Sequence, residues 1–181
     1  MPASAHTTIL VGRLDDLFWL RVEGRGTFQN SLLVKRSMEA MMTAGVRIFV
    51  VDLERCPIMD STFLGTLTGI AIRLREVGEG KVHVINANPR NLQLMASLGL
   101  NYILEVDENG TQWQEQRRRA AALLAGSSQP TAPAPDKEAQ TEHVLEAHQA
   151  LADLSDANAT RFQDVIEFLE KEVGRTGSES A

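Results

Sequence analysis

A proline-rich segment divides this sequence into two parts that must fold by different rules. Residues 127–136 carry prolines at 130, 133 and 135 among Ser, Thr, Gln and Ala residues. Proline fixes φ and lacks a backbone N–H, so such a run cannot be helical and favours extended, solvated polyproline II. We therefore predict a linker over residues 127–137, between a domain at residues 1–126 and a separate tail.

Strand-like and helix-like segments alternate through the first 126 residues. The run at 47–53 is almost wholly apolar, as in a strand that is buried on both faces. The expected strands cover 9–14, 18–23, 47–53, 81–86 and 102–106, and the expected helices cover 31–44, 60–77, 88–98 and 111–125. Strands that alternate with helices imply βαβ crossovers. We predict an α/β fold, with a mixed β-sheet of about five strands, four helices and a C-terminal helical extension.

The tail at residues 138–174 is acidic and shows only a helical pattern. Its apolar seam follows coiled-coil spacing through Val144, His148, Leu151, Ser155, Asn158, Phe162, Val165 and Leu169. Ser155 and Asn158 would be buried polar residues, so either the helix breaks near 153–160 into a hairpin or the seam is short and weak. Plausible helix starts lie at Thr141-Glu142 and Thr160. The apolar stripe needs the domain or another chain to cover it, and we expect residues 175–181 to be disordered.

Charge and cysteine content narrow the class of partners. The formal net charge is -6, and residues 127–181 hold 4 Lys and Arg against 11 Asp and Glu. A near-neutral domain with an acidic tail offers no basic face for nucleic acid. No apolar run is long enough to cross a bilayer, so we expect no membrane insertion. One cysteine, Cys56, cannot form an internal disulfide, and we predict a cytoplasmic protein.

The usual enzymatic motifs are missing from the sequence. It contains no Walker-type GxxxxGK[ST], HExxH, CxxC or GxSxG pattern. His143 and His148 are five residues apart, about 140° around a helix, which is unsuited to a metal pair. We expect a non-catalytic protein without metal or cofactor.

A polar triplet at the start of the second expected helix is the strongest candidate site. Asp60, Ser61 and Thr62 follow the turn that contains Pro57, where first-turn N–H groups lack intrahelical partners. All three can cap the helix. A phosphate on a hydroxyl there would face unsatisfied N–H donors and the positive end of the helix dipole. We therefore expect a solvent-exposed hydroxyl that can act as a switch.

These residues resemble the signature of STAS domains, the fold of bacterial anti-sigma-factor antagonists. The resemblance covers about residues 7–125 and includes the Asn88-Pro89 helix start and Leu98-Gly99-Leu100. In that family the motif reads Asp-Ser-Ser/Thr-Gly-Leu-Gly. The matching positions are the leading acid Asp60, the first hydroxyl Ser61, the phosphoacceptor Thr62, the apolar Leu64 and the glycine Gly65, with Phe63 in place of the family's first glycine.

The resemblance implies a signalling domain that is switched by phosphorylation. Its partner would be a serine/threonine kinase that doubles as an anti-sigma factor, with a cognate phosphatase. Thr62, or else Ser61, would take the phosphate, and the partner would contact the segment 60–65. The bulky ring of Phe63 would either narrow the kinase's approach to Thr62 or add an apolar contact to the partner.

The alternative is a constitutive STAS scaffold subunit of a larger assembly, such as a stress-signalling particle or a lipid-transport complex, without phosphorylation. A small-molecule hydrolase is a third idea, which lacks a nucleophile and base pair. We expect the acidic tail to mediate self-association or to dock a dedicated partner.

Overall fold

The central element of the molecule is a five-stranded mixed sheet. The computed structural model describes residues 6–130 and 133–179, with side chains described up to residue 175. The strands lie in the order β1-β2-β3-β4-β5, with β1 antiparallel to β2 and every other neighbouring pair parallel. Their bounds are β1 Thr8–Leu14, β2 Leu17–Glu23, β3 Ile48–Arg55, β4 Lys81–Ile85 and β5 Glu105–Val106. The predicted α/β class and mixed sheet are confirmed.

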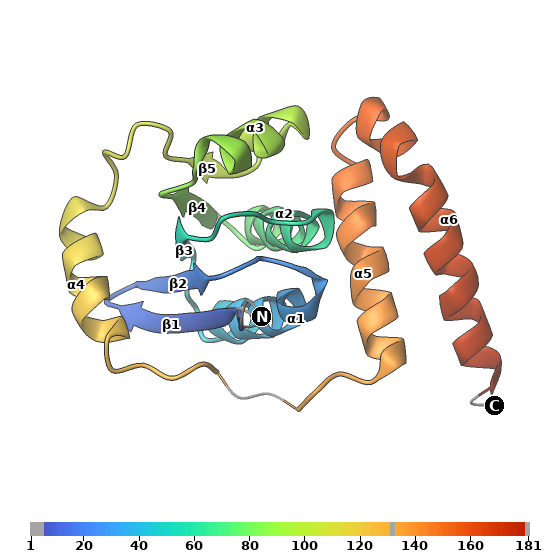
Figure 1. The fold of residues 1–181 in the computed structure, drawn as a ribbon, viewed down its shortest axis with the longest axis horizontal. Coiled ribbons are helices and arrows are strands. Elements are labelled where there is room, and N and C mark those ends of the chain that lie inside the picture. The colour runs from blue at the N-terminus through green and yellow to red at the C-terminus, as the bar shows by residue number, and fades with distance from the viewer. Residues whose placement is uncertain (1–5, 131–132, 180–181) are drawn as a thin grey trace, which may run out of the picture.

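Helices cover both faces of this sheet (Figure 1). The first three, α1 (Phe28–Thr43), α2 (Ser61–Glu76) and α3 (Pro89–Ser97), pack with Phe18, Leu20, Phe49 and Val51 in the main core. On the other face α4 (Gln114–Leu124) packs Ala120 and Leu124 against Leu17, Trp19 and Val50. β3 is therefore buried on both faces, as its apolar run predicts.

The segment between β4 and α4 differs in detail from the expected pattern. The last strand is shorter than predicted, because Leu100–Tyr102 forms a 3₁₀ turn, η1, and only Glu105–Val106 pairs with β4. The carboxylate of Asp107 accepts the backbone N–H groups of Thr111 and Gln112, at 3.1 Å each. These bonds hold residues 111–112 in a loop, so α4 begins at Gln114 instead of near residue 111.

The tail is a helical hairpin of α5 (Lys137–Ala152) and α6 (Asp156–Glu179). The chain breaks between them, within the expected range. Asn158 is 2% exposed, and its Nδ2 donates to the carbonyl oxygens of Leu98, at 3.0 Å, and Leu151, at 2.9 Å. The polar residue in the apolar seam is thereby satisfied and connects the hairpin to the end of α3.

The starts of both tail helices differ from the predicted ones. Asp136 caps α5 by accepting the N–H of Ala139 at 2.7 Å, and Ser155 Oγ accepts the N–H of Asn158 at 3.2 Å. The predicted starts at Thr141 and Thr160 are therefore wrong by about one turn. α6 also continues to Glu179, through residues expected to be disordered, while 180–181 and linker residues 131–132 lie outside the described residues.

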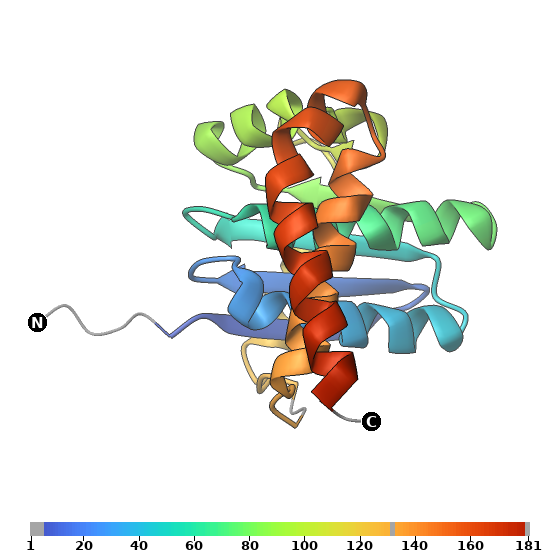
Figure 2. The same cartoon turned by 90° about the vertical axis from the view of Figure 1, so that its right-hand side faces the viewer.

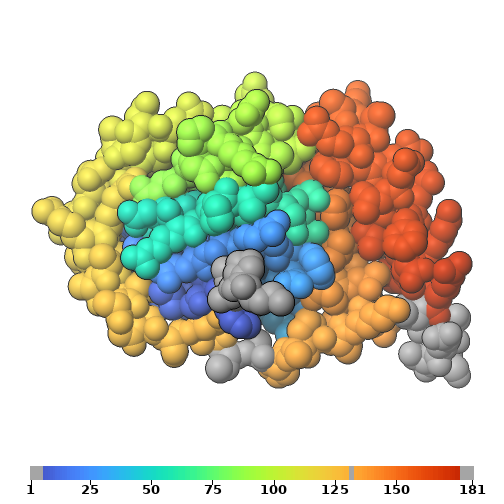
Figure 3. All heavy atoms as spheres, viewed as in Figure 1, coloured from blue at the N-terminus to red at the C-terminus, as the bar shows by residue number. Residues whose placement is uncertain are grey.

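The hairpin packs on α2, on the side of the helical layer that faces away from the sheet. In Figure 1, α5 stands beside α1 and α2, and α6 lies beyond α5. Figure 2 shows both tail helices running across α1 and α2 over their N-terminal halves. In the space-filling view of Figure 3, the orange and red hairpin meets the rest of the molecule along its whole height. The apolar stripe of the tail is thus covered within the chain.

Candidate functional site at the N-terminus of α2

Asp60 joins the starts of two helices. Its Oδ1 accepts the backbone N–H of Phe63 at 2.8 Å, and its Oδ2 accepts that of Phe28 at 2.9 Å. One carboxylate therefore caps α2 and also satisfies a first-turn donor of α1, both at the positive ends of helix dipoles. Of the three residues that could cap α2, the structure assigns this role to Asp60.

Ser61 is hydrogen-bonded to the tail. Its Oγ lies 3.0 Å from Nε2 of His148, on α5. The other ring nitrogen of His148, Nδ1, lies 2.8 Å from the carbonyl oxygen of Val144, which can only accept. Nδ1 therefore carries a proton and donates it to this carbonyl, while Nε2 is hydrogen-bonded to the hydroxyl of Ser61.

Thr62 is buried, which contradicts the expected exposure of this hydroxyl. Its side chain is 5% exposed. The neighbouring Ser61 and, one turn later, Thr66 both bond to histidines of α5, so α5 crosses the turn of α2 that contains Thr62. Thr62 opens a helix as predicted, and it lies between two residues that bond to the tail, which sequence patterns could not place.

Phe63 and Leu64 belong to the core and not to the surface. Both side chains are 0% exposed. A Cβ on Gly26 would lie 3.0 Å from Cγ of Phe63, so the ring fills the space next to that glycine. Phe63, which departs from the family motif, therefore points inward. It neither narrows a partner's approach nor offers an apolar contact on the surface of this structure.

Gly65 allows α5 to approach α2 closely. A Cβ on Gly65 would lie 2.1 Å from the backbone oxygen of Ala147, a distance that no real contact reaches. One turn further along α2, a Cβ on Gly69 would lie 3.8 Å from Cβ of Ala150, which is ordinary contact. The two helices thus cross through small residues, and the family's glycine position is the tightest point of the crossing.

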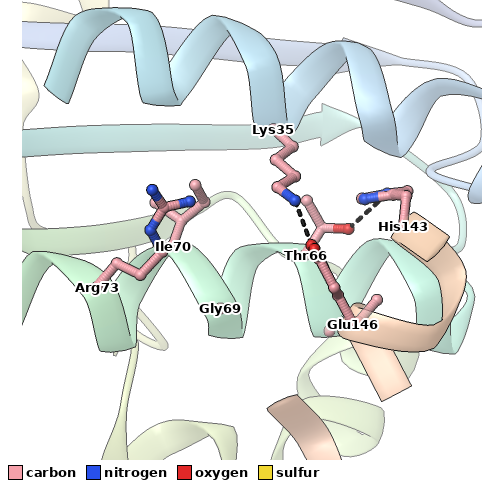
Figure 4. A pocket seen from close by; sticks show the side chains of 9 residues that line it. Lys35, Thr66, Gly69, Ile70, Arg73, His143 and Glu146 are labelled. Carbon is pink, nitrogen blue, oxygen red and sulfur yellow. Dashed lines mark hydrogen bonds and ion pairs between the residues drawn. The ribbon is translucent and has the colours of Figure 1, made fainter. Parts of the chain in front are cut away.

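His143 forms the second polar contact between the tail and the domain. Its Nε2 lies 2.8 Å from Ser31 Oγ on α1 and 3.2 Å from Thr66 Oγ1 on α2, as Figure 4 shows for Thr66. Beside it is a small pocket of about 70 Å³, whose wall includes Lys35 and Glu146, an ion pair between α1 and α5. Burial, with the nearby positive charge of Lys35, lowers the pKa of His143 to about 4.

Sequence reasoning missed both histidines of α5 as site residues. A separation of five residues is unsuited to a metal pair, and the sequence offered no other role for them. In the structure this separation places His143 at the junction of α1 and α2 and His148 beside Ser61. A usable signal was present in the small residues, since Gly65 and Gly69 are one turn apart, and so are Ala147 and Ala150. Such spacing is typical of a close helix crossing.

The described part of the chain shows neither a cluster of metal-ligating side chains nor a membrane-spanning helix. Within residues 6–130 and 133–179, no group of three or more His, Cys, Asp or Glu side chains is placed to hold a metal ion. No helix in the same residues is long and apolar enough to cross a membrane.

Comparison with known proteins identifies the domain. The STAS domain family model matches residues 8–110. The chain belongs to the STAS domain family. The comparison with curated proteins found no match.

Solved structures share the STAS fold at low sequence identity. The anti-sigma factor antagonist SpoIIAA in its unphosphorylated form is 16% identical, with a TM-score of 0.50, and the match covers 61% of this chain and 97% of SpoIIAA. An anti-sigma factor antagonist from Mycobacterium paratuberculosis is 17% identical, with a TM-score of 0.50, and the match covers 67% of this chain and 99% of that protein. The α5–α6 hairpin begins at Lys137, beyond the residues that the STAS model matches.

Proposed function

We propose that this STAS protein is a non-catalytic signalling domain of the anti-sigma-factor-antagonist type, which acts in the cytoplasm by binding a serine/threonine kinase-type anti-sigma partner. The observation that carries the proposal is the position of Asp60, Ser61 and Thr62 at the first turn of α2 in a STAS fold. This is the position of the phosphoacceptor in the family that the sequence resembles. A cognate phosphatase would reverse the modification.

The proposed switch is electrostatic. A phosphate on Thr62 or Ser61 adds about -1.5 to -2 charges at pH 7. Burying that anion in a partner interface costs several kcal/mol, and each ~1.4 kcal/mol is about a tenfold change in affinity. The unmodified protein would bind its partner, and the phosphorylated protein would release it without unfolding.

The burial of Thr62 favours a second candidate function, that of a constitutive scaffold subunit. Thr62 is only 5% exposed, so a kinase cannot reach its hydroxyl while the hairpin is docked, whereas a constitutive scaffold subunit of a larger assembly needs no modification there. Ser61 is more exposed than Thr62, but its hydroxyl is engaged by His148. The scaffold reading therefore predicts an unmodified triplet at all times.

Mass analysis of the full chain isolated from its own host separates the two functions. We expect a fraction of the protein to carry an increment of about 80 Da, mapped to the peptide that contains Ser61 and Thr62. Thr62→Ala and Ser61→Ala, expressed in the same host, identify the acceptor by which of them removes the increment. A protein that carries no phosphate in growing or stressed cells would contradict the switch and support the scaffold.

A further inference from the structure

We propose that the α5–α6 hairpin is a displaceable cover, which occupies in cis the face of α2 that a partner or kinase must reach. This inference rests on the proposed function and adds its regulation. The tail would set the threshold for partner binding, because docking of the hairpin and access to Thr62 exclude each other.

The cover lies on the motif itself. Ser61 bonds to α5, Gly65 is in closest approach to α5, and Thr62, between them, is buried. Phe63 and Leu64 face the core in any case. While the hairpin is docked, only Ser61 of the segment 61–65 is partly exposed, and its hydroxyl is engaged by His148.

The composition of the α5 face suits reversible docking. The buried side chains of α5 are two polar rings and two apolar groups, namely His143, His148, Ala147 and Leu151, and Leu151 joins the main core cluster together with Phe162 of α6. The sheet-facing side of α2, in contrast, buries Phe63, Leu64, Leu67, Ile70 and Leu74, all at 1% exposure or less. Interfaces between two units of one chain resemble transient protein–protein interfaces when they contain polar residues. The two units are then expected to move relative to each other.

The linker keeps a released hairpin near its site. Residues 127–136 have the proline-rich, polar composition of a semi-rigid spacer, so a released hairpin stays tethered to the domain. A tethered segment rebinds at an effective concentration in the millimolar range, so a free partner competes with it at a disadvantage. The apparent Kd of a partner is its intrinsic Kd divided by the open fraction. Mutations that change docking must therefore change access to α2 by the same factor.

A disulfide between α2 and α5 can lock the cover. In Gly69→Cys/Ala150→Cys the two Cβ atoms would be 3.8 Å apart, the separation typical of disulfides. Reduction of the same protein restores the unlocked state, and Gly69→Ser/Ala150→Ser is the matched control that cannot cross-link. Ala147→Glu is the opening variant, because it places a charge at a buried position of α5 without altering α2.

The first measurement is amide hydrogen exchange of the first two turns of α2 in the full chain. We expect exchange at least about tenfold faster in Ala147→Glu than in the wild type, and slower in the oxidised double cysteine variant than after its reduction. Equal exchange in the oxidised, reduced and Ala147→Glu forms would show that α5 is a fixed part of the core, and would overturn the proposal. The proposal would also be overturned if the wild-type chain sediments as a dimer in which the two copies have exchanged their hairpins.

The second measurement is phosphate incorporation into the Ser61–Thr62 peptide, with ATP and a dialysed extract of the host as the source of kinase. The cover predicts most phosphate in Ala147→Glu, less in the wild type and least in the oxidised lock. Equal incorporation in the oxidised and reduced lock would overturn the cover. If exchange responds as predicted and no form takes phosphate, the cover stands and the proposed phosphorylation is the part that fails.

Discussion

Single residues decide how the three helices α1, α2 and α5 meet. Asp60 satisfies a first-turn donor of two different helices with its two carboxylate oxygens. We predict that Asp60→Ala lowers the free energy of unfolding by about 2 kcal/mol, since each lost cap is worth about 1 kcal/mol. Asp60→Asn keeps one acceptor oxygen and should lose about half as much. Urea unfolding of the three proteins measures the difference, and equal stability of all three would contradict the double cap.

Replacing Gly65 by alanine would stabilise α2 taken alone but would destabilise its packing against α5. Replacing a helical glycine by alanine ordinarily stabilises the helix by about 0.5–1 kcal/mol. Gly65→Ala would, however, set a methyl group 2.1 Å from the oxygen of Ala147. We predict a lower melting temperature for Gly65→Ala and faster hydrogen exchange in α5, while the matched control Gly69→Ala is neutral or stabilising. A stabilised Gly65→Ala protein would mean that α5 does not pack there in solution.

At the scale of elements, docking of the tail should depend on pH through His143. Burial lowers the pKa of this imidazole to about 4, and Lys35 and Arg36 act in the same direction, against Glu146. In a released hairpin the pKa would be near 6.5. The docked state thus binds fewer protons between pH 6.5 and pH 4, so its stabilisation is complete above pH 6.5 and is lost as the pH falls through that range.

The variant His143→Gln isolates this effect from other titrations. Between pH 7 and pH 4 we expect the wild type to lose about 3 kcal/mol more docking free energy than His143→Gln, which has no ring to protonate. Hydrogen exchange of α5 amides at each pH, corrected for the intrinsic rate, gives the comparison. Parallel pH profiles of the two proteins would show that His143 is not buried against Ser31 and Thr66.

Local sequence patterns were sufficient for most elements and insufficient for their mutual placement. The hairpin of β1 and β2, the buried strand β3 and the Asn88 cap of α3 follow from alternation, an apolar run and a capping residue. The polar residues Ser155 and Asn158 in the apolar seam left two possibilities open, a helix break or a short and weak seam, and the structure has the break. Periodicity does not say which surface an apolar stripe will cover. The contact of α5 with α2, and the burial of Thr62, depend on residues more than seventy positions apart.

At the scale of the whole molecule, the tail adds two layers to a STAS domain. From one side to the other, the layers are α4, the sheet, the group α1 to α3, α5 and finally α6 (Figure 1). The family match ends at residue 110, and the outer layers lie on the surface where the family motif begins α2. The same chain therefore contains the proposed partner surface and a segment that covers it.

Thiol labelling at residue 62 tests this account most directly. The full chain with Thr62→Cys, in a Cys56→Ser background, carries a single thiol of nearly the size of the native side chain. We predict that it reacts with a maleimide at least about tenfold more slowly than the same protein with Ala147→Glu added, because the hairpin must open first. Equal, fast labelling of both proteins would show that residue 62 is not covered by the tail, and would contradict the account.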